Sequence, residues 1–161
     1  MRTLRFAFLF AMLPAMLCAL GCSKQMIPNS DVEDTTQNRD VVLFCEKYRH
    51  ALEDKNVGVL LKIMSPAYFE DGGNTKTDDD ADFYKVREFL TGDFLRTSGI
   101  RYEIRYRKVI FTEKQHIYVD YTYDAAWKLP GTKQDEWRHT IAENRLDLVK
   151  DGDSYKIVAG M

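Results

Sequence analysis

Long segments in the second half of the chain alternate between apolar and polar residues, and this alternation constrains the fold more than any other feature. The alternating segments are residues 100–111, 115–129, 136–150 and 154–158. A period of two puts successive side chains on opposite faces of a β-strand. The connections, with turn signals at 112–114, 130–131 and 151–152, are too short for a parallel crossover. The sequence therefore predicts a long antiparallel meander.

One of these segments, 136–150, changes parity along its length. Trp137 and Ile141 occupy odd positions, whereas the apolar residues near its end, Leu146 and Leu148, occupy even ones. If both sets face the core, the strand needs an extra residue to change register. The pattern predicts a β-bulge near Ala142–Asn144.

Helical spacing of apolar residues predicts helices before the meander. The first is expected over 39–53, with Asn38 as its N-cap. A short helix over 57–64, a short strand over 67–69 and a third helix over 79–95 follow. Acidic residues in the first turn of the third helix suit the helix dipole. Helices followed by a run of strands are typical of the α+β class.

The amino terminus has the layout of a bacterial lipoprotein signal. Arg2 and Arg5 precede an apolar run, 6–20, which is too short to span a bilayer comfortably but suits a secretory signal. The run ends in the sequence Ala-Leu-Gly-Cys at 19–22, which resembles a lipobox. The resemblance implies that Cys22 is lipidated and becomes the first residue of the mature chain.

Lipidation at Cys22 implies several acyl chains such as palmitate, which stable anchoring requires. The next residue influences sorting in Gram-negative lipoproteins, and Ser23 suggests the outer membrane, facing the periplasm. One alternative is an unmodified Cys22 behind an ordinary signal peptide. A second is processing at Cys18, which the large Leu17 before it disfavours.

These features divide the chain into a signal peptide (1–21), a lipidated cysteine with a flexible polar tether (22–37) and a folded domain (38–161). The mature chain has 140 residues with 21 basic and 25 acidic side chains, a net charge of −4. That balance excludes an ordinary nucleic-acid-binding protein. Besides Cys22 the mature chain keeps only Cys45, whose position among apolar helix residues predicts a small core residue.

The order of elements over 38–161 resembles the NTF2-like (SnoaL-like) domain. The resemblance rests on the first helix with its ending at 52–56, the short helix after it, the stretch 65–69 and the closing strand 151–158. It implies a cone in which three N-terminal helices pack on a long, curved antiparallel sheet around a pocket. Members often form homodimers through the sheet. Some are isomerases, dehydratases or epoxide hydrolases, and many bind a ligand or a partner without catalysis.

Catalytic members of this class place a carboxylate, often with Tyr or His, inside the pocket. The candidates here are His139, Asp124 and Asp120, with Tyr121 to orient a substrate. Asp120 and Asp124 have the parity opposite to the apolar residues of their strand, so a solvated sheet surface is the simpler interpretation. The direction of the His139 side chain depends on the predicted bulge. The simpler interpretation is a histidine without a catalytic role, either with its hydrogen bonds satisfied or partly exposed.

Aromatic residues form the second candidate set. The expected pocket residues are Tyr48, Tyr68, Tyr102, Tyr106, Tyr123, Trp127, Trp137 and Arg138. Aromatic side chains with polar tips suit an apolar ligand, although a plain core needs the same residues. The histidines at 50, 116 and 139 lie too far apart for zinc, and no metal or cofactor is expected.

Two functions remain open at this point. The first is a lipid-anchored cell-envelope protein that binds a small apolar ligand or an envelope protein partner without catalysis. The second is a small cofactor-independent isomerase, dehydratase or hydrolase with an acid–base site in the cone. An enzyme needs at least two polar groups that converge inside the pocket, so the directions of Asp120, Asp124, His139 and Arg138 distinguish the two.

Overall fold

The computed structural model describes residues 24–72, 77–131 and 134–161. The predicted signal peptide and Cys22 lie outside the described residues. The main sheet consists of β3 (Ser98–Phe111), β4 (His116–Leu129), β5 (Glu136–Asp151) and β6 (Ser154–Ala159), which are neighbours in chain order and antiparallel. The predicted meander is therefore confirmed.

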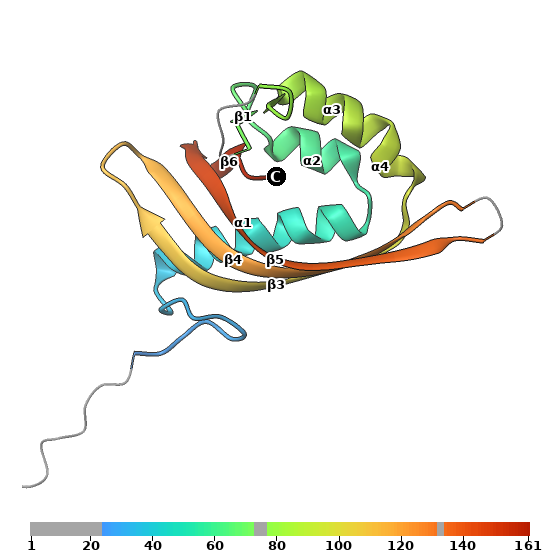
Figure 1. The fold of residues 1–161 in the computed structure, drawn as a ribbon. Helices are drawn as coiled ribbons and strands as arrows, with labels where there is room; N and C mark the ends of the chain where they lie inside the picture. Colours follow the sequence, from blue (N-terminus) through green and yellow to red (C-terminus); the bar gives the residue numbers. More distant parts are fainter. Residues whose placement is uncertain (1–23, 73–76, 132–133) are drawn as a thin grey trace, which may run out of the picture.

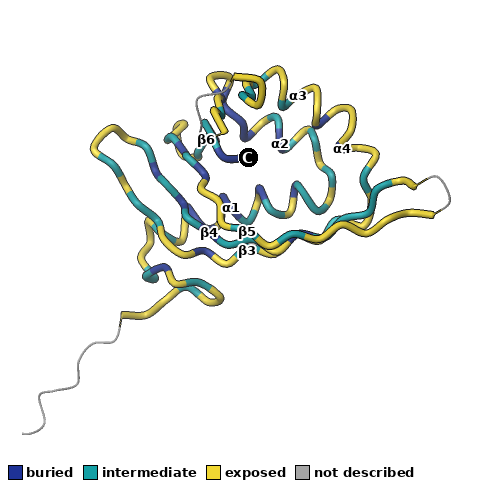
Figure 2. Tube along the Cα trace, viewed as in Figure 1, coloured by how far each residue is buried: buried dark blue, intermediate teal, exposed yellow. Residues whose placement is uncertain are grey.

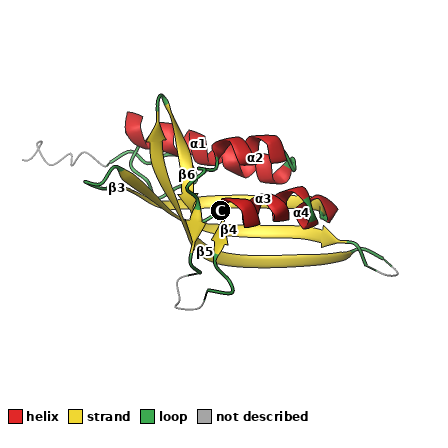
Figure 3. Ribbon diagram, turned by 90° about the horizontal axis from the view of Figure 1, so that it is seen from above, coloured by secondary structure: helices red, strands yellow, loops and turns green. Residues whose placement is uncertain are grey.

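Helices cover the concave face of this sheet (Figures 1 and 3). They are α1 (Thr36–Glu53), α2 (Val57–Ile63), α3 (Phe83–Thr91) and the one-turn α4 (Asp93–Arg96). Two short strands, β1 (Phe69–Glu70) and β2 (Ala81–Asp82), pair beside the helices. The α+β class and the packing of helices on a long, curved sheet are as predicted.

Helix ends differ from the predictions where side chains cap them. The N-cap of α1 is Thr35, which accepts a hydrogen bond from the Asn38 amide, so Asn38 lies inside the helix. The predicted helix 79–95 is wrong in extent. It begins only after Asp82, which caps it, and it bends at Gly92, where a Cβ atom would lie 3.1 Å from the Glu88 carbonyl oxygen.

The core lies between the helices and the concave face of the sheet (Figure 2). Its most buried side chains are Val41, Cys45, Tyr48, Leu60, Met64, Val119, Tyr121, Leu146, Leu148 and Ile157. Cys45 is fully buried, as predicted, and burial raises the pKa of its thiol. A neutral, inaccessible thiol is a packing group and not a nucleophile.

The predicted bulge in β5 is wrong. The β4–β5 register runs without interruption from His116 opposite Val149 to Leu129 opposite Glu136. Trp137 and Ile141 are 52% and 62% exposed on the convex face, so they need not share the inward parity of the Leu146 side chain. The apolar residues of β5 change parity although its register does not. Part of the β4–β5 hairpin extends beyond the helices, where neither face of the strand is fully covered (Figure 1).

Residues 24–35, expected to be part of a flexible tether, instead pack against β3; we call this segment the N-terminal strap. The Asp31 amide donates a 2.9 Å hydrogen bond to the Tyr106 carbonyl. The Asp31 carboxylate accepts hydrogen bonds from Arg105 at 2.7 Å and Arg107 at 2.8 Å, and Val32 is buried. Folded structure therefore begins before residue 38, because a carboxylate and one apolar side chain fix an otherwise polar segment.

The Asp31 contacts give a first testable prediction. Arg105 and Arg107 lower the pKa of Asp31 from 3.8 to about 2. The carboxylate therefore holds the strap fully above about pH 4 and progressively less as the pH falls toward 2. Asp31→Asn should make strap amides exchange with solvent deuterium severalfold faster at neutral pH. Glu33→Gln, which removes only the strap's own ion pair with Lys24, is the control. Unchanged strap exchange in the Asp31 variant would contradict this role.

Candidate ligand-binding cavity

A cavity of about 490 Å³ lies between the concave face of the sheet and the helices. The sheet contributes Ile100, Tyr102, Tyr123, Ala125, Trp127, Leu129, Thr140 and Asn144. The helices and the segments beside them contribute Tyr48, Leu52, Phe89, Asp93, Phe94, Thr97 and Met161. The volume falls in the range of small-molecule sites, and most of the lining is aromatic or aliphatic.

Strand parity and helix spacing explain how these side chains converge. Tyr123, Ala125 and Trp127 lie at alternate positions of β4, so they share the face that the helices cover. Tyr48 and Leu52 are four residues apart on α1 and point from one side of that helix. The same period-two and 3.6-residue patterns that build the core therefore build the cavity wall.

Tyrosine rings form the inner end of the cavity. Tyr102 and Tyr123 stack at a centroid distance of 5.4 Å with an interplanar angle of 15°. Tyr48 meets Tyr102 edge-on at 6.4 Å. Such contacts hold rings rigidly, so the wall presents a fixed aromatic surface to a ligand.

The phenol groups at this end are buried or half-buried. The Asn144 side-chain amide donates a 3.1 Å hydrogen bond to the Tyr121 hydroxyl. Burial raises the pKa of Tyr102 to about 12 and also raises those of Tyr48 and Tyr121. The hydroxyls stay protonated near neutral pH, so they act as hydrogen-bonding groups and not as bases.

Charge is scarce in the cavity. Among the lining residues in the described part of the chain, only Asp93 carries a charged side chain. The Asp93 side chain is 77% exposed and lies 3.4 Å from the Arg96 guanidinium. A solvated, paired carboxylate at the rim is a poor general base, and the described lining residues supply no second carboxylate, histidine or lysine side chain to work with it.

The acid–base candidates from the sequence lie outside this cavity. His139 and Asp124 do meet, with 2.7 Å between Nε2 and Oδ1, but both side chains are more than half exposed on the convex face. Asp120 pairs with Arg145 at 2.6 Å on the same face. Tyr121 is inside but almost fully buried behind Tyr102. The structure thus brings the histidine and one carboxylate together, but on the side away from the aromatic lining.

Half of the aromatic prediction matches the cavity: Tyr48, Tyr102, Tyr123 and Trp127 line it. The other four candidates are placed elsewhere. Tyr68 is buried and accepts a hydrogen bond from the Met161 amide, and the Tyr106 hydroxyl donates to Glu46 at 2.8 Å. Trp137 lies on the convex face with the Lys128 ammonium 5.0 Å from its ring, and Arg138 pairs with Glu136.

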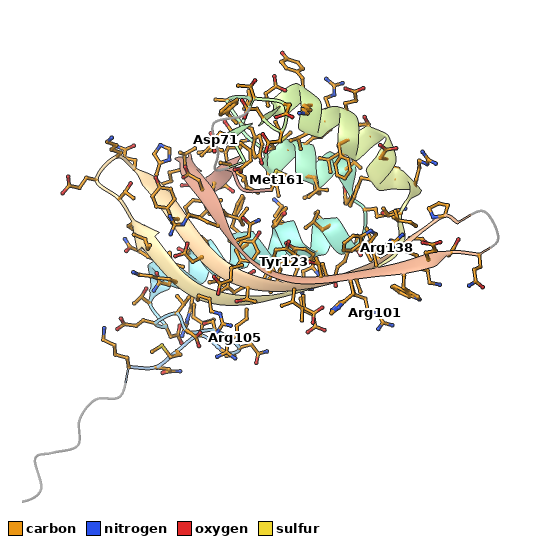
Figure 4. All side chains as sticks on the ribbon, in the orientation of Figure 1. Asp71, Arg101, Arg105, Tyr123, Arg138 and Met161 are labelled. Atoms are coloured by element: carbon orange, nitrogen blue, oxygen red, sulfur yellow. The ribbon has the colours of Figure 1, made fainter. Side chains whose placement is uncertain are left out.

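The misplaced residues fall into two pairs: Tyr68, just before β1, and Tyr106, on β3, are buried in the core, whereas Trp137 and Arg138 lie at the exposed end of β5. Tyr123 lies on the helix side of the sheet and Arg101 and Arg105 lie on the other side (Figure 4). Trp137 belongs to the second group because its strand position is odd, in the unbroken register that places Leu146 inside.

Several lining residues are absent from the sequence-based prediction. Thr140 and Asn144 share the inward parity of Leu146, and polar residues at inward positions of a strand are the signal that could have identified them. Phe94 and Met161 carry no such signal, because their positions depend on the bend at Gly92 and on the path of the chain after β6.

The described residues offer neither a metal site nor a membrane-spanning helix. Residues 24–72, 77–131 and 134–161 contain no group of three or more His, Cys, Asp or Glu side chains that could hold a metal ion. Within the same ranges no helix combines the length and apolar character needed to cross a bilayer.

No protein-family model and no curated protein matches the sequence. Solved structures do match. An NTF2-like protein from Streptomyces avermitilis, provisionally a dehydratase, has a TM-score of 0.64 at 13% identity, covering 78% of this chain and 94% of that one. A provisional scytalone dehydratase from Novosphingobium aromaticivorans has a TM-score of 0.63 at 12% identity, covering 77% and 80%.

The domain has an NTF2-like fold. The protein Aln2 from a Streptomyces species is also similar, with a TM-score of 0.59 at 8% identity over 81% of this chain and 91% of that one. At such identities the likeness establishes the NTF2-like architecture alone. The function of this NTF2-like domain depends on the residues of its own cavity.

Proposed function

We propose that this chain is a lipid-anchored protein of the cell envelope whose NTF2-like domain binds a small, uncharged apolar ligand without catalysis. The observation that carries the proposal is the lining of the cavity, which is aromatic and aliphatic apart from a few hydroxyl, amide and rim groups. Burial of apolar ligand surface against such a wall is favourable, by about 25 cal/mol per Å².

The anchor part of the proposal rests on the sequence around Cys22 and on the position of the strap. The strap leaves the domain on the convex side of the sheet, whereas the helices lie on the concave side (Figure 1). A lipid at Cys22 would therefore hold the domain by the face opposite the cavity. The cavity would stay open to ligands in the periplasm, at the outer membrane if the source is Gram-negative.

The alternative function is a small cofactor-independent enzyme, which the dehydratase descriptions of two similar structures favour. It requires a base inside the cavity, and His139 and Asp124 lie on the opposite face. Asp93 is the remaining carboxylate at the rim. Turnover of a carbonyl or alcohol substrate that is lost in Asp93→Asn would support the enzyme and contradict the binding proposal.

A paired tryptophan experiment tests where a ligand binds. The probe is N-phenyl-1-naphthylamine, an uncharged dye that fluoresces when it enters an apolar site. The protein is the chain from Ser23 onward, because the strap, helices and sheet that bury the core all lie within residues 24–161. Trp127→Ala should weaken dye binding severalfold, since Trp127 lines the cavity.

Trp137→Ala is the matched control, since Trp137 is half exposed on the convex face. It should leave dye affinity unchanged. Loss of binding in the Trp137 variant with retention in the Trp127 variant would place the site on the outer surface and contradict the proposal. Dye binding that neither substitution affects would contradict it as well.

A further inference from the structure

The link between the proposed lipid and the domain is shorter than the polar sequence of the predicted tether implies. Met26 and Glu33 form an antiparallel bridge within the strap, and the Lys24 ammonium pairs with the Glu33 carboxylate at 2.8 Å. Only Ser23 separates Lys24 from Cys22. Two extended residues span about 7 Å, so a lipid at Cys22 would keep the end of the strap within that distance of the headgroup layer.

The side of the domain that this short link brings toward a bilayer is the convex face of the sheet. The strap is bound to β3 through the Asp31 amide and the Tyr106 carbonyl, and its N-terminal end lies on the convex side (Figure 1). Arg101 and Arg105 project from the same side (Figure 4). Side chains on the convex face would therefore lie close to lipid headgroups.

An aromatic ring with two cations lies on this face; we call Arg101, Lys128 and Trp137 the Trp137 cluster. The Lys128 ammonium lies 5.0 Å and the Arg101 guanidinium 6.0 Å from the centroid of the Trp137 ring. The ring packs closely on β3, because a Cβ atom at Gly99 would lie only 3.3 Å from its Cη2 atom. Attraction between the cations and the ring holds the three side chains together.

The two cations of the Trp137 cluster are available to an external anion. Arg105, on the same face, is already paired with Asp31. Within residues 24–72, 77–131 and 134–161, no ion pair joins Arg101 or Lys128 to a carboxylate. The cluster therefore has two positive charges that the described part of the chain does not neutralise.

The apolar surface beside these cations indicates the kind of anion that fits. Trp137 and Ile141 are both more than half exposed on the convex face. Indole rings are enriched at membrane–water interfaces, because the ring is apolar and its N–H group is polar. Basic side chains near such a surface are attracted to anionic headgroups. A free anion would pair with the cations but leave the apolar surface in water, whereas a bilayer surface accommodates both.

We propose that the Trp137 cluster is a membrane contact, which binds the headgroups of anionic phospholipids and places the convex face of the sheet against the bilayer. This inference rests on the proposed lipid anchor at Cys22. The anchor attaches the domain, and the cluster sets its orientation. The helices and the cavity then lie on the side of the sheet away from the lipids.

The test couples the mature chain, from Cys22 onward, to vesicles through a maleimide lipid, which reacts with Cys22 because the Cys45 thiol is fully buried. The vesicles contain phosphatidylcholine alone, or phosphatidylcholine and phosphatidylglycerol in equal parts. Both kinds also contain a phospholipid with a nitroxide on its headgroup, which quenches tryptophan fluorescence at short range. Trp127→Phe leaves Trp137 as the only tryptophan. Its fluorescence should be quenched, and more strongly on the vesicles with phosphatidylglycerol.

Two comparisons locate the contact. Trp137→Phe leaves only Trp127, which lines the cavity, so its fluorescence should not be quenched on either kind of vesicle. Arg101→Gln combined with Lys128→Gln, in the Trp127→Phe chain, removes both cations and leaves the Trp137 ring. The additional quenching on phosphatidylglycerol should then be lost.

Lys62→Gln combined with Arg87→Gln is the matched control, because it removes two exposed cations from α2 and α3. It should keep the additional quenching. Quenching of Trp137 no stronger than that of Trp127, as when a second copy of the chain covers the convex face, overturns the inference. Equal quenching on the two kinds of vesicle overturns it as well, as does additional quenching that survives without Arg101 and Lys128 or is lost in the control.

Failure of this inference is distinguishable from failure of the proposed anchor. The maleimide supplies the attachment chemically, so the fluorescence result does not depend on whether Cys22 is acylated in cells. Lipidation of Cys22 is measured separately, by incorporation of labelled palmitate.

Discussion

Replacing Ala125 by phenylalanine is expected to weaken N-phenyl-1-naphthylamine binding at least tenfold, which corresponds to about 1.4 kcal/mol or more. Ala125 lies opposite Tyr102 on β3 and Thr140 on β5, and all three residues line the cavity. A phenyl ring at this position projects into the 490 Å³ space that the ligand would occupy. Because the ring fills open volume rather than packed core, the fold should tolerate it better than overpacking elsewhere.

The neighbouring residue supplies a matched control for this substitution. Ala126 lies opposite Arg101 and His139, on the convex face. Ala126→Phe therefore adds the same ring to the same strand on the side away from the cavity. We expect dye affinity within about twofold of the unmodified protein, since a ring on this face leaves the cavity volume unchanged. Equal weakening by both variants, or by neither, would show that the cavity is not the binding site.

The strands show which part of the fold can be predicted from sequence alone. Alternation along β4 marks Tyr121, Tyr123 and Trp127 as one face and Asp120 and Asp124 as the other, and the structure agrees. This works because the period of a strand is a local property of the backbone. The helices that precede the sheet then cover its apolar face, so the sequence also predicts which face of the sheet is buried.

The wrong predictions concern residues whose burial depends on distant parts of the chain. A tryptophan on a strand usually finds cover, which favours a pocket position for Trp137, but the unbroken β4–β5 register puts it on the convex face, which the helices do not cover. The polar sequence around Asp31 predicts a flexible tether, yet its carboxylate pairs with Arg105, 74 residues away. No local sequence pattern predicts the position of Trp137 or the ion pair of Asp31, since each depends on which distant segment of the chain lies beside it.

The candidate site shows the same division between residues that a local pattern predicts and residues that depend on long-range packing. Aromatic residues at inward positions predict four of the lining residues, whereas Thr140 and Asn144 are missed although their parity is inward. The contact between Tyr48 and Tyr102 could not be predicted at all. It requires a helix residue to meet a strand residue, and only the packing of the two layers brings their rings together edge-on.

Replacing Cys22 by serine is expected to remove the protein from the lipid-modified fraction completely, because a thioether to diacylglycerol forms only on a thiol. The measurement is incorporation of an alkyne-tagged palmitate in cells, followed by separation of membrane and soluble fractions. We expect no label on Cys22→Ser and a shift of the processed domain to the soluble fraction. A variant retained through an uncleaved leader would still carry no label, so labelling reads lipidation independently of location.

The two other cysteines of the chain serve as comparisons for the Cys22→Ser prediction. Cys18→Ser removes a thiol from the segment that processing at Cys22 discards, so both label and membrane association should remain unchanged. Cys45 is fully buried in the core and cannot reach an acylating enzyme in the folded domain. Label lost in Cys18→Ser, or kept in Cys22→Ser, would move the anchor to another residue. The strap would then no longer connect the domain to a lipid at Cys22, and the inferred orientation of the cavity away from the bilayer would fail with it.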